Sequence, residues 1–324
     1  MDMVSSPWLP SAASTQAGDV DALFNFILYA SIAFFLIVLV GVVVFAWRYR
    51  RRGKAGLTSG KDHSLALEIT WTAIPIVLII IVFIWGFRGY MRANVVPNDA
   101  LEVKVTGQKW FWSFDYPEGA SAVNELVVPV HKPIKLLMSS KDVIHSFFVP
   151  NFRVKMDVLP NRYTMAWFEA TAEGTYPLYC AEYCGKGHSE MLGTVRVVND
   201  STYNAWLESS TVLGEGLSLE EYGEQLYTAK ACVTCHSLDG TIKEGPSFRG
   251  LYGTQTLLQD GARVTVDENY VRESILNPRA KIVNGFQPVM PTFQGILKDR
   301  QVDALIAYIK SLRESSDQNE QNRQ

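Results

Sequence analysis

Two long hydrophobic stretches open the chain, and short apolar runs separated by turn residues follow them. The first stretch covers about residues 23–47 without a charged residue, and the second covers about residues 65–87. A helix needs about 20 apolar residues to cross a bilayer, so each stretch is long enough. The pattern predicts a transmembrane helical hairpin over residues 23–94, with Ser64 as N-cap of the second helix and Pro75 inside it.

The flanking charges predict the orientation of this hairpin. Six basic residues lie between the two stretches, whereas the polar segment of residues 1–22 contains acids and no base. Arg88 and Arg92 follow the second stretch and favour the opposite orientation. The six basic residues of the loop outweigh these two under the positive-inside rule. We therefore expect the loop to be cytoplasmic and everything after about Asn94 to lie outside, together with the N-terminus. Without a basic residue, the first 22 residues lack the n-region of a simple cleavable signal peptide.

Residues 95–199 have the pattern of an all-β domain. Leu101, Val103 and Val105 alternate with polar residues, as a half-buried strand does. Further apolar runs follow, and Gly, Pro, Asn and Asp separate them; they read LVVPV, IKLLMS, HSFFVP, YTMAWFEA, YPLYC and GTVRVV. Several short strands at such spacing predict a sandwich or barrel, with functional residues on loops at one end.

The remainder of the chain predicts a connector, a helical domain and a tail. Residues 200–216 have a connector composition around Trp206. In residues 217–313, Ser218 and Glu221 form a capping-box pattern, and apolar residues recur on one helical face over residues 299–312. We expect the polar residues 314–324 to be disordered. Acids and bases are balanced over residues 217–313, so docking of an external partner should depend only weakly on salt.

Composition adds few constraints beyond these patterns. The chain has 324 residues, a formal net charge of −3 and 48% hydrophobic residues, so nothing indicates nucleic-acid binding. All four cysteines fall into two pairs, each close to a histidine, and none is left for a structural disulfide framework. An outside location would be oxidising, which leaves open a disulfide between Cys180 and Cys184.

The stretch CAEYCGKGHSEM contains a dense set of metal-ligating side chains. It places Cys180, Cys184, His188 and Met191 within twelve residues, and His145 is the upstream candidate for a second imidazole. Two thiolates, an imidazole and a thioether suit copper better than zinc, which uses thiolate and imidazole ligands in closed structural sites. The alternative is the disulfide together with a surface histidine and a core methionine.

The helical domain carries the sequence Cys232-Val233-Thr234-Cys235-His236. C-x-x-C-H is the attachment signature of c-type haem, with both thiols bonded to the porphyrin and the histidine bound to iron. A redox dithiol or half a zinc site is the alternative, although no histidine follows His236. Met290 is the one methionine after Cys235 and is therefore the candidate for the second axial ligand.

The first of these motifs resembles the CuA motif of cytochrome c oxidase subunit II, C-x-E-x-C-x3-H-x2-M, at every position. The resemblance implies a cupredoxin-like Greek-key barrel and a binuclear copper centre. Cys180 and Cys184 would bridge the coppers, and His145, His188, Met191 and the carbonyl of Glu182 would complete the ligand set. The Glu182 side chain would help to bind magnesium together with another chain.

Two further residues gain a role from the same resemblance. Trp110, in the aromatic run Trp110-Phe111-Trp112, matches the tryptophan on the route by which electrons enter subunit II. Since strand neighbours point to opposite faces, at least one of these three rings should be exposed or lie against a partner. Glu68 matches the acid at the mouth of a proton channel, and intramembrane acids often mark ion or proton paths. The alternative is that Glu68 has no function, because an acid near a helix N-terminus at the membrane surface costs little energy.

The whole order resembles subunit II of a bacterial caa-type cytochrome c oxidase with a fused class I cytochrome c domain, in which Pro246 would pack near the haem. The resemblance implies electron transfer from haem c through CuA to catalytic subunit I in the bacterial inner membrane, where oxygen is reduced and protons are transported. The donor would be a cytochrome c or a quinol-oxidising complex. The alternatives are the corresponding subunit of a CuA-containing nitric oxide reductase and a membrane-tethered copper-delivery protein.

Overall fold

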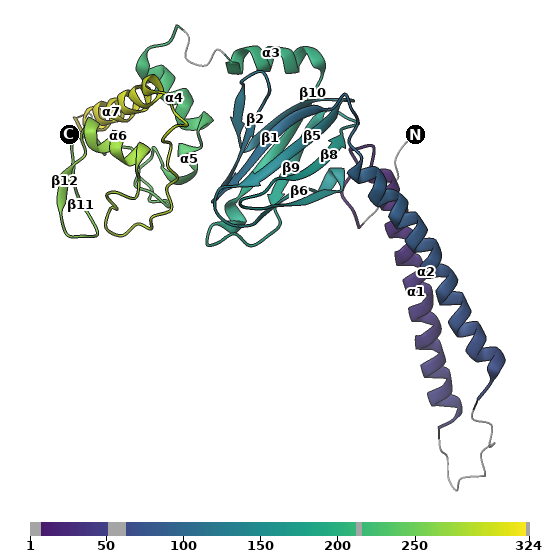
Figure 1. Ribbon diagram of the computed structural model, residues 1–324. Coiled ribbons are helices and arrows are strands. Elements are labelled where there is room, and N and C mark those ends of the chain that lie inside the picture. Colours follow the sequence, from purple (N-terminus) through teal and green to yellow (C-terminus); the bar gives the residue numbers. More distant parts are fainter. Residues whose placement is uncertain (1–7, 51–62, 212–215, 322–324) are drawn as a thin grey trace.

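The computed structural model describes residues 8–50, 63–211 and 216–321. These residues form a helical hairpin, a β domain and a helical domain, with the hairpin and the helical domain at opposite ends of the β domain (Figure 1). The predicted multidomain fold class is confirmed.

The hairpin consists of α1 (Ala17–Arg48) and α2 (Leu65–Asn94), which lie side by side (Figure 1). Both helices are long and apolar enough to cross a membrane, and both extend beyond the predicted spans. α2 continues through Pro75 and through the arginines after the apolar stretch, since Arg, Met and Ala favour helix. Ser64 takes the N-cap position, but its side chain makes no capping hydrogen bond. Most of the predicted cytoplasmic loop, residues 51–62, lies outside the described residues.

The segment before α1 packs against the β domain and is not a separate polar segment. Ala13 and Ser14 are buried, and Ser14 forms a β-bridge with Ala170. The guanidinium of Arg153 binds both carboxylate oxygens of Asp21 in α1, at 2.7 and 2.9 Å. The expected boundary at residue 22 therefore lies within a helix, and this bidentate ion pair ties the hairpin to the β domain.

The β domain consists of two five-stranded sheets with strand orders β3-β2-β1-β5-β8 and β4-β10-β9-β6-β7. The strands of the first sheet are β1 (Leu101–Gln108), β2 (Phe111–Asp115), β3 (Ser121–Val123), β5 (Pro133–Ser140) and β8 (Thr164–Glu169). The strands of the second are β4 (Glu125–Pro129), β6 (His145–Val149), β7 (Val154–Val158), β9 (Gly174–Cys180) and β10 (Leu192–Val198). Two short 3-10 helices, η1 (Pro150–Phe152) and η2 (His188–Glu190), lie in connections of the second sheet.

The core of this cupredoxin-like domain lies between the two sheets. In β5 half-buried and buried residues alternate, beginning with the half-buried Pro133, as the period of a strand requires. The predicted alternation in β1 is also present, with Val103 and Val105 buried. Trp112, Phe114, Phe147 and Phe168 are among the largest fully buried side chains. This rigid scaffold presents the ends of β6 and β9 to the loop of residues 181–191, which carries predicted copper ligands and is called the copper-ligand loop below.

The predicted connector contains a helix, α3 (Asp200–Thr211). Its residues Tyr203, Trp206 and Leu207 pack against the core of the β domain. The connector prediction is therefore wrong over this helix. The apolar residues recur at positions three and four apart, which gives an amphipathic helix. This spacing is present around Trp206, but the surrounding Ser, Thr and Asn residues are typical of a loop, so the helix was not predicted.

The last domain contains α4 (Leu219–Ala229), α5 (Cys232–Cys235), α6 (Glu268–Leu276) and α7 (Asp299–Gln321). The predicted capping box is confirmed: Ser218 Oγ accepts from Glu221 N, and Glu221 accepts from Ser218 N. A small hairpin of β11 (Gln255–Leu257) and β12 (Arg263–Thr265) interrupts the expected all-α domain. α7 continues to Gln321, where we expected a disordered tail, because no Pro or Gly ends it.

Candidate metal centres

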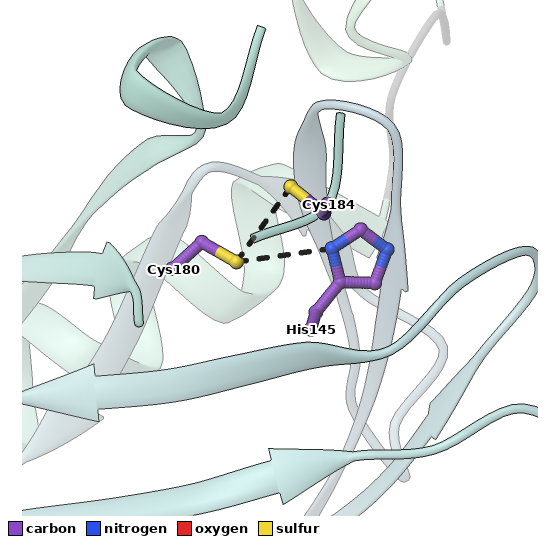
Figure 2. A group of neighbouring side chains, drawn as sticks. All are labelled: His145, Cys180 and Cys184. Atoms are coloured by element: carbon purple, nitrogen blue, oxygen red, sulfur yellow. Dashed lines mark hydrogen bonds between the residues drawn. The ribbon is translucent and has the colours of Figure 1, made fainter. Parts of the chain in front are cut away.

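The predicted copper ligands converge at one end of the β domain. Cys180 is the last residue of β9, and His145 opens the neighbouring strand β6, whose Phe147 pairs with Cys180. The loop from β9 to β10 carries Cys184, His188 and Met191 back over these strand ends. Figure 2 shows the sulfur of Cys180 in contact with both Cys184 and His145.

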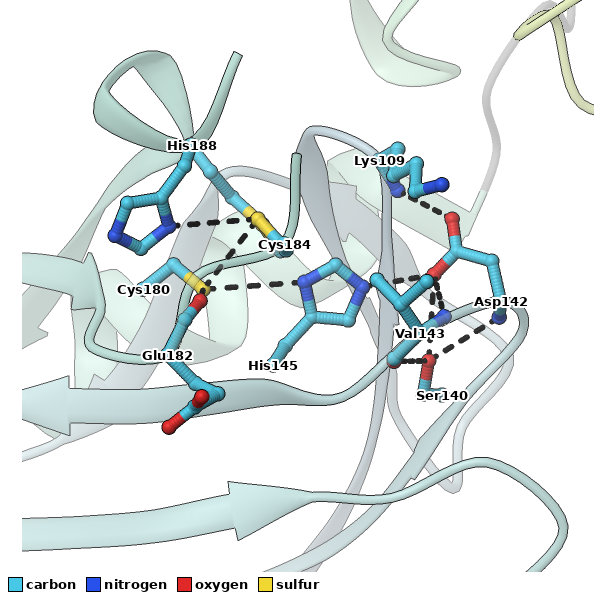
Figure 3. Close-up of polar contacts among 10 residues, drawn as sticks. Lys109, Ser140, Asp142, Val143, His145, Cys180, Glu182, Cys184 and His188 are labelled. Carbon is cyan, nitrogen blue, oxygen red and sulfur yellow. Dashed lines mark hydrogen bonds and ion pairs between the residues drawn. The ribbon is translucent and has the colours of Figure 1, made fainter. Parts of the chain in front are cut away.

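The ligand atoms lie close together. The two cysteine sulfur atoms are 3.8 Å apart, and Cys180 Sγ is 3.8 Å from His145 Nδ1. Cys184 Sγ is 3.5 Å from His188 Nδ1 and 3.7 Å from Met191 Sδ. The carbonyl oxygen of Glu182 lies 3.2 Å from Cys180 Sγ (Figure 3). All six predicted residues therefore contribute an atom to one cluster. A disulfide has sulfur atoms about 2.05 Å apart, so the disulfide alternative is wrong.

Most of this cluster is buried, while His188 is half-buried and the side chain of Glu182 is exposed. His145 and Met191 are 0% exposed and Cys184 is 2% exposed. Burial opposes ionisation of Cys180, but its contacts with His145 and with backbone groups outweigh burial and lower its pKa to about 7. Burial and the charge of Cys180 raise the pKa of Cys184 to about 12. Two buried thiolates so close together need cations beside them, which fits a thiolate-bridged copper site.

Asp142 is a functional residue that the sequence analysis missed. Its Oδ1 lies 2.8 Å from Nε2 of His145, and the backbone N–H groups of Lys109 and Val143 donate to its carboxylate (Figure 3). Burial of His145 opposes protonation, yet Asp142 and Cys180 together raise its pKa. With the proton held at Nε2, the lone pair of Nδ1 faces the cysteine sulfur atoms. The spacing Asp-x-x-His in the sequence could have indicated that Asp142 is a hydrogen-bond partner of His145.

The aromatic run beside the copper loop is buried throughout. Trp110, Phe111 and Trp112 are 5%, 7% and 0% exposed. Trp110 lies in the turn between β1 and β2, where its ring covers Gly185 and Gly187; a Cβ on Gly187 would be 2.7 Å from the indole. No ring of this run is exposed, and Phe111 alone faces the other domain, where it lines the cavity described next.

The predicted haem ligands share one apolar cavity in the helical domain. Cys232, Cys235, His236 and Met290 all line it. Nδ1 of His236 donates to the carbonyl of Pro246 at 2.7 Å, and Phe248 stacks on the imidazole with ring centroids 4.4 Å apart. Burial lowers the pKa of His236, so the ring is neutral and its Nε2 is free to bind iron. The donors and the apolar walls fit a covalently attached haem.

Charges from both domains act on Cys235, one of the two thiols of this cavity. Burial raises the pKa of Cys235 to about 11, and the carboxylates of Glu244 and Glu190 add to the effect. Glu190 belongs to η2 in the β domain, so its charge acts across the boundary between the domains. By contrast, Glu68 lies half-buried in the first turn of α2. This helix begins at the end of the hairpin that points away from the β domain (Figure 1).

Comparisons with known proteins match three consecutive parts of the chain. The family model of cytochrome c oxidase subunit II, transmembrane domain, matches residues 3–88, and that of its periplasmic domain matches residues 120–198. The cytochrome c family model matches residues 220–313. Cytochrome c oxidase subunit 2 of Alkalihalophilus pseudofirmus is 32% identical over 295 residues, which cover 86% of this chain and 84% of that protein. The chain belongs to the cytochrome c oxidase subunit 2 family.

Other members of the subunit 2 family match less of the chain. Cytochrome c oxidase subunit 2 of Cereibacter sphaeroides is 29% identical over 238 residues, or 61% of this chain and 78% of that protein. The crystal structure of the periplasmic domain of the Bradyrhizobium japonicum subunit II covers 36% of this chain and 96% of that chain, with 36% identity and a TM-score of 0.35.

Membership of the subunit 2 family defines the general role of the chain. It is an electron-transfer subunit of a haem–copper oxidase, an oxidoreductase complex with further subunits. Its oxidase and cytochrome c domains imply copper and haem. The chain is a membrane protein with its β domain outside the membrane.

Proposed function

We propose that this chain passes electrons one at a time from a covalently bound haem c to a binuclear CuA centre. From there they would reach a haem of catalytic subunit I, where oxygen is reduced to water and protons are transported. The observation that carries this proposal is the convergence of His145, Cys180, Cys184, His188 and Met191, with the carbonyl of Glu182, in one largely buried cluster.

Copper bound there would supply a delocalised one-electron couple. Cys180 and Cys184 would bridge the metals, and His145 and His188 would each bind one of them through Nδ1, the nitrogen that faces a cysteine sulfur. Asp142 fixes the imidazole of His145, and burial of both cysteines, His145 and Met191 limits the access of water. A cage that is already formed limits rearrangement when the charge changes. All these features suit an electron relay.

The haem would be held by Cys232, Cys235 and His236, with Met290 as the second axial ligand. Pro246 fixes the proton of His236 at Nδ1 and leaves Nε2 for iron. Histidine and methionine ligation gives cytochromes c a high reduction potential, as a terminal oxidase requires. This division assigns copper to residues 95–199 and haem to residues 217–313.

The location and partners extend the same proposal. Acids before and at the start of α1, and the basic cluster that begins at its end, favour an orientation with both termini and both centres on the outer side. The membrane would be the inner membrane of a bacterium, so that the outer side is periplasmic. The donor would be a cytochrome c or a quinol-oxidising complex. Glu68 would lie near a proton-uptake path, and Trp110 on the route of electrons into copper. Glu182 has an exposed side chain, so magnesium would require ligands from subunit I.

Copper delivery is less compatible with the observed cluster. A delivery protein must release its metal to a partner, which requires accessible ligands. Four of the five side-chain ligands are buried, at most 8% exposed, and His188 is half-buried. A chelator in solution should therefore remove copper slowly from the folded chain, whereas a delivery site would lose it at once.

The decisive experiment is purification of the chain with its partner subunits. We expect stoichiometric haem c, two coppers per chain, and oxygen uptake with a reduced donor; nitric oxide uptake without oxygen uptake would identify a nitric oxide reductase. Cys184→Ser should abolish the near-infrared copper band and leave the haem spectrum intact. Loss of both spectra, or survival of both, would contradict two separate centres.

A further inference from the structure

The ring of Phe111 lies at the boundary between the two domains. It is 7% exposed, yet among the described residues it belongs to neither hydrophobic core. Instead it lines the cavity formed by the helical domain around Cys232, Cys235 and His236. Strand β2 of the copper domain therefore contributes a wall of the haem cavity.

Polar contacts connect the same two surfaces. Nζ of Lys186, in the loop between Cys184 and His188, lies 2.9 Å from Oε1 of Glu244. Glu244 precedes Gly245, which passes so close to the imidazole of His236 that a Cβ would lie 2.5 Å from the ring. This ion pair thus joins the copper-ligand loop to the segment that packs on the proposed haem ligand.

A second polar contact borders Phe111 on the other side. Nζ of Lys230, at the C-terminal end of α4, donates to Oγ of Ser121 in β3 at 3.1 Å. Lys230 lines the haem cavity together with Phe111. An exposed ion pair contributes little stability alone. The buried aromatic ring would therefore supply most of the binding free energy between the domains, and the polar contacts would fix their relative orientation.

We propose that Phe111, oriented by the Lys186–Glu244 ion pair, forms the contact through which the haem domain docks onto the copper domain of its own chain. Phe111 and its neighbour Trp110, which covers the copper-ligand loop, would fill the space between the centres with packed aromatic atoms. Electron tunnelling is faster through packed protein than across a gap. This inference rests on the proposed function and adds the docking residues to it.

Cross-linking tests the contact independently of electron transfer. A carbodiimide joins an amine to a carboxylate in direct contact, so treatment of the full chain should yield a peptide that links Lys186 to Glu244. The link should be absent from Glu244→Gln and present in Lys310→Glu, which alters an ion pair within the haem domain. Absence of the link from the parent protein would overturn the docking geometry.

Kinetics test the consequence in the holo-oxidase. After rapid photoreduction of haem c, electron arrival at copper is followed by the near-infrared band. Lys186→Glu should slow this step by roughly fivefold at low salt, the upper range for an exposed ion pair, and Lys186→Glu combined with Glu244→Lys should restore it. Phe111→Leu should also slow the step, while Tyr163→Leu, at an exposed site of the same domain, should not.

These outcomes separate the two proposals. Unchanged rates in both Lys186→Glu and Phe111→Leu, with copper and haem retained, would overturn the docking inference and leave the electron-transfer function intact. Failure of photoreduced haem to reduce copper in the parent oxidase would contradict the proposed function itself.

Discussion

The carboxylate of Asp142 lies 2.8 Å from Nε2 of His145, on the side of the imidazole away from the cysteine sulfur atoms (Figure 3). His145 is fully buried at the start of β6 and cannot reach solvent for a hydrogen bond. Asp142 is itself fixed by the backbone N–H groups of Lys109 and Val143. The turn between β5 and β6 therefore sets which imidazole nitrogen faces the metal site.

Replacement of Asp142 should weaken copper binding without removing a ligand. Loss of the carboxylate partner of a metal-bound histidine typically costs about 10–100-fold in metal affinity. For Asp142→Asn we expect a loss in this range, measured by competition with a copper chelator, together with a shifted near-infrared band. Asp260→Asn is the matched control, since Asp260 lies in the haem domain and accepts from the backbone N–H of Ala262. Equal affinity in Asp142→Asn and the parent would remove Asp142 from the site.

Gly245 gives a corresponding test of the haem cavity. A Cβ at this position would lie 2.5 Å from Cε1 of His236, so Gly245→Ala must displace the imidazole. We expect reduced haem content and a destabilisation of about 1–3 kcal/mol, the usual cost of overpacking. Haem content per chain and thermal unfolding are the measurements. Gly89→Ala, where a Cβ meets no atom within 4 Å, should change neither, and a normal haem spectrum in Gly245→Ala would contradict this placement of His236.

Met290 should determine the reduction potential of the haem. Met290→Ala should lower it by on the order of 100 mV, a modest part of the roughly 0.8 V that axial ligands span. A redox titration of the haem band in the purified oxidase measures this change. Met165→Ala, on β8 of the copper domain, should leave the potential unaltered. The same potential in both variants would exclude Met290 as an iron ligand.

Local patterns in the sequence predicted the parts of this molecule that depend on neighbouring residues. Alternation in β5, the capping box at Ser218 and the two apolar helices each follow from residues close in the chain. The copper motif was equally local, because Cys180, Cys184, His188 and Met191 share one loop. His145 was also found, although it lies 35 residues before Cys180, since few histidines were available.

Contacts between distant segments were not predictable in the same way. The ion pair of Arg153 with Asp21 joins residues 132 apart, so nothing in either local sequence indicated that α1 is tied to the β domain. The burial of Trp110 depends on Gly187, whose missing Cβ makes room for the indole ring. Phe111 looked like one more aromatic residue of a strand, and only the arrangement of the domains places it in the haem cavity.

Copper uptake should release protons, and its affinity should rise with pH. In the metal-free chain, burial and the charge of Cys180 raise the pKa of Cys184 to about 12, so this thiol is protonated at neutral pH. Each proton that must leave before metal binds makes the affinity rise about tenfold per pH unit. Above pH 7, where Cys180 with its pKa of about 7 is ionised, Cys184 contributes a slope of one proton. His145, whose pKa Asp142 and Cys180 raise, adds to this slope until its imidazole is neutral. Below pH 7 the slope should steepen, since Cys180 must then lose its proton too. Chelator competition across this range, with the protonation of the chelator calibrated at each pH, measures the slope. An affinity independent of pH would mean that the thiols are already ionised in the metal-free chain.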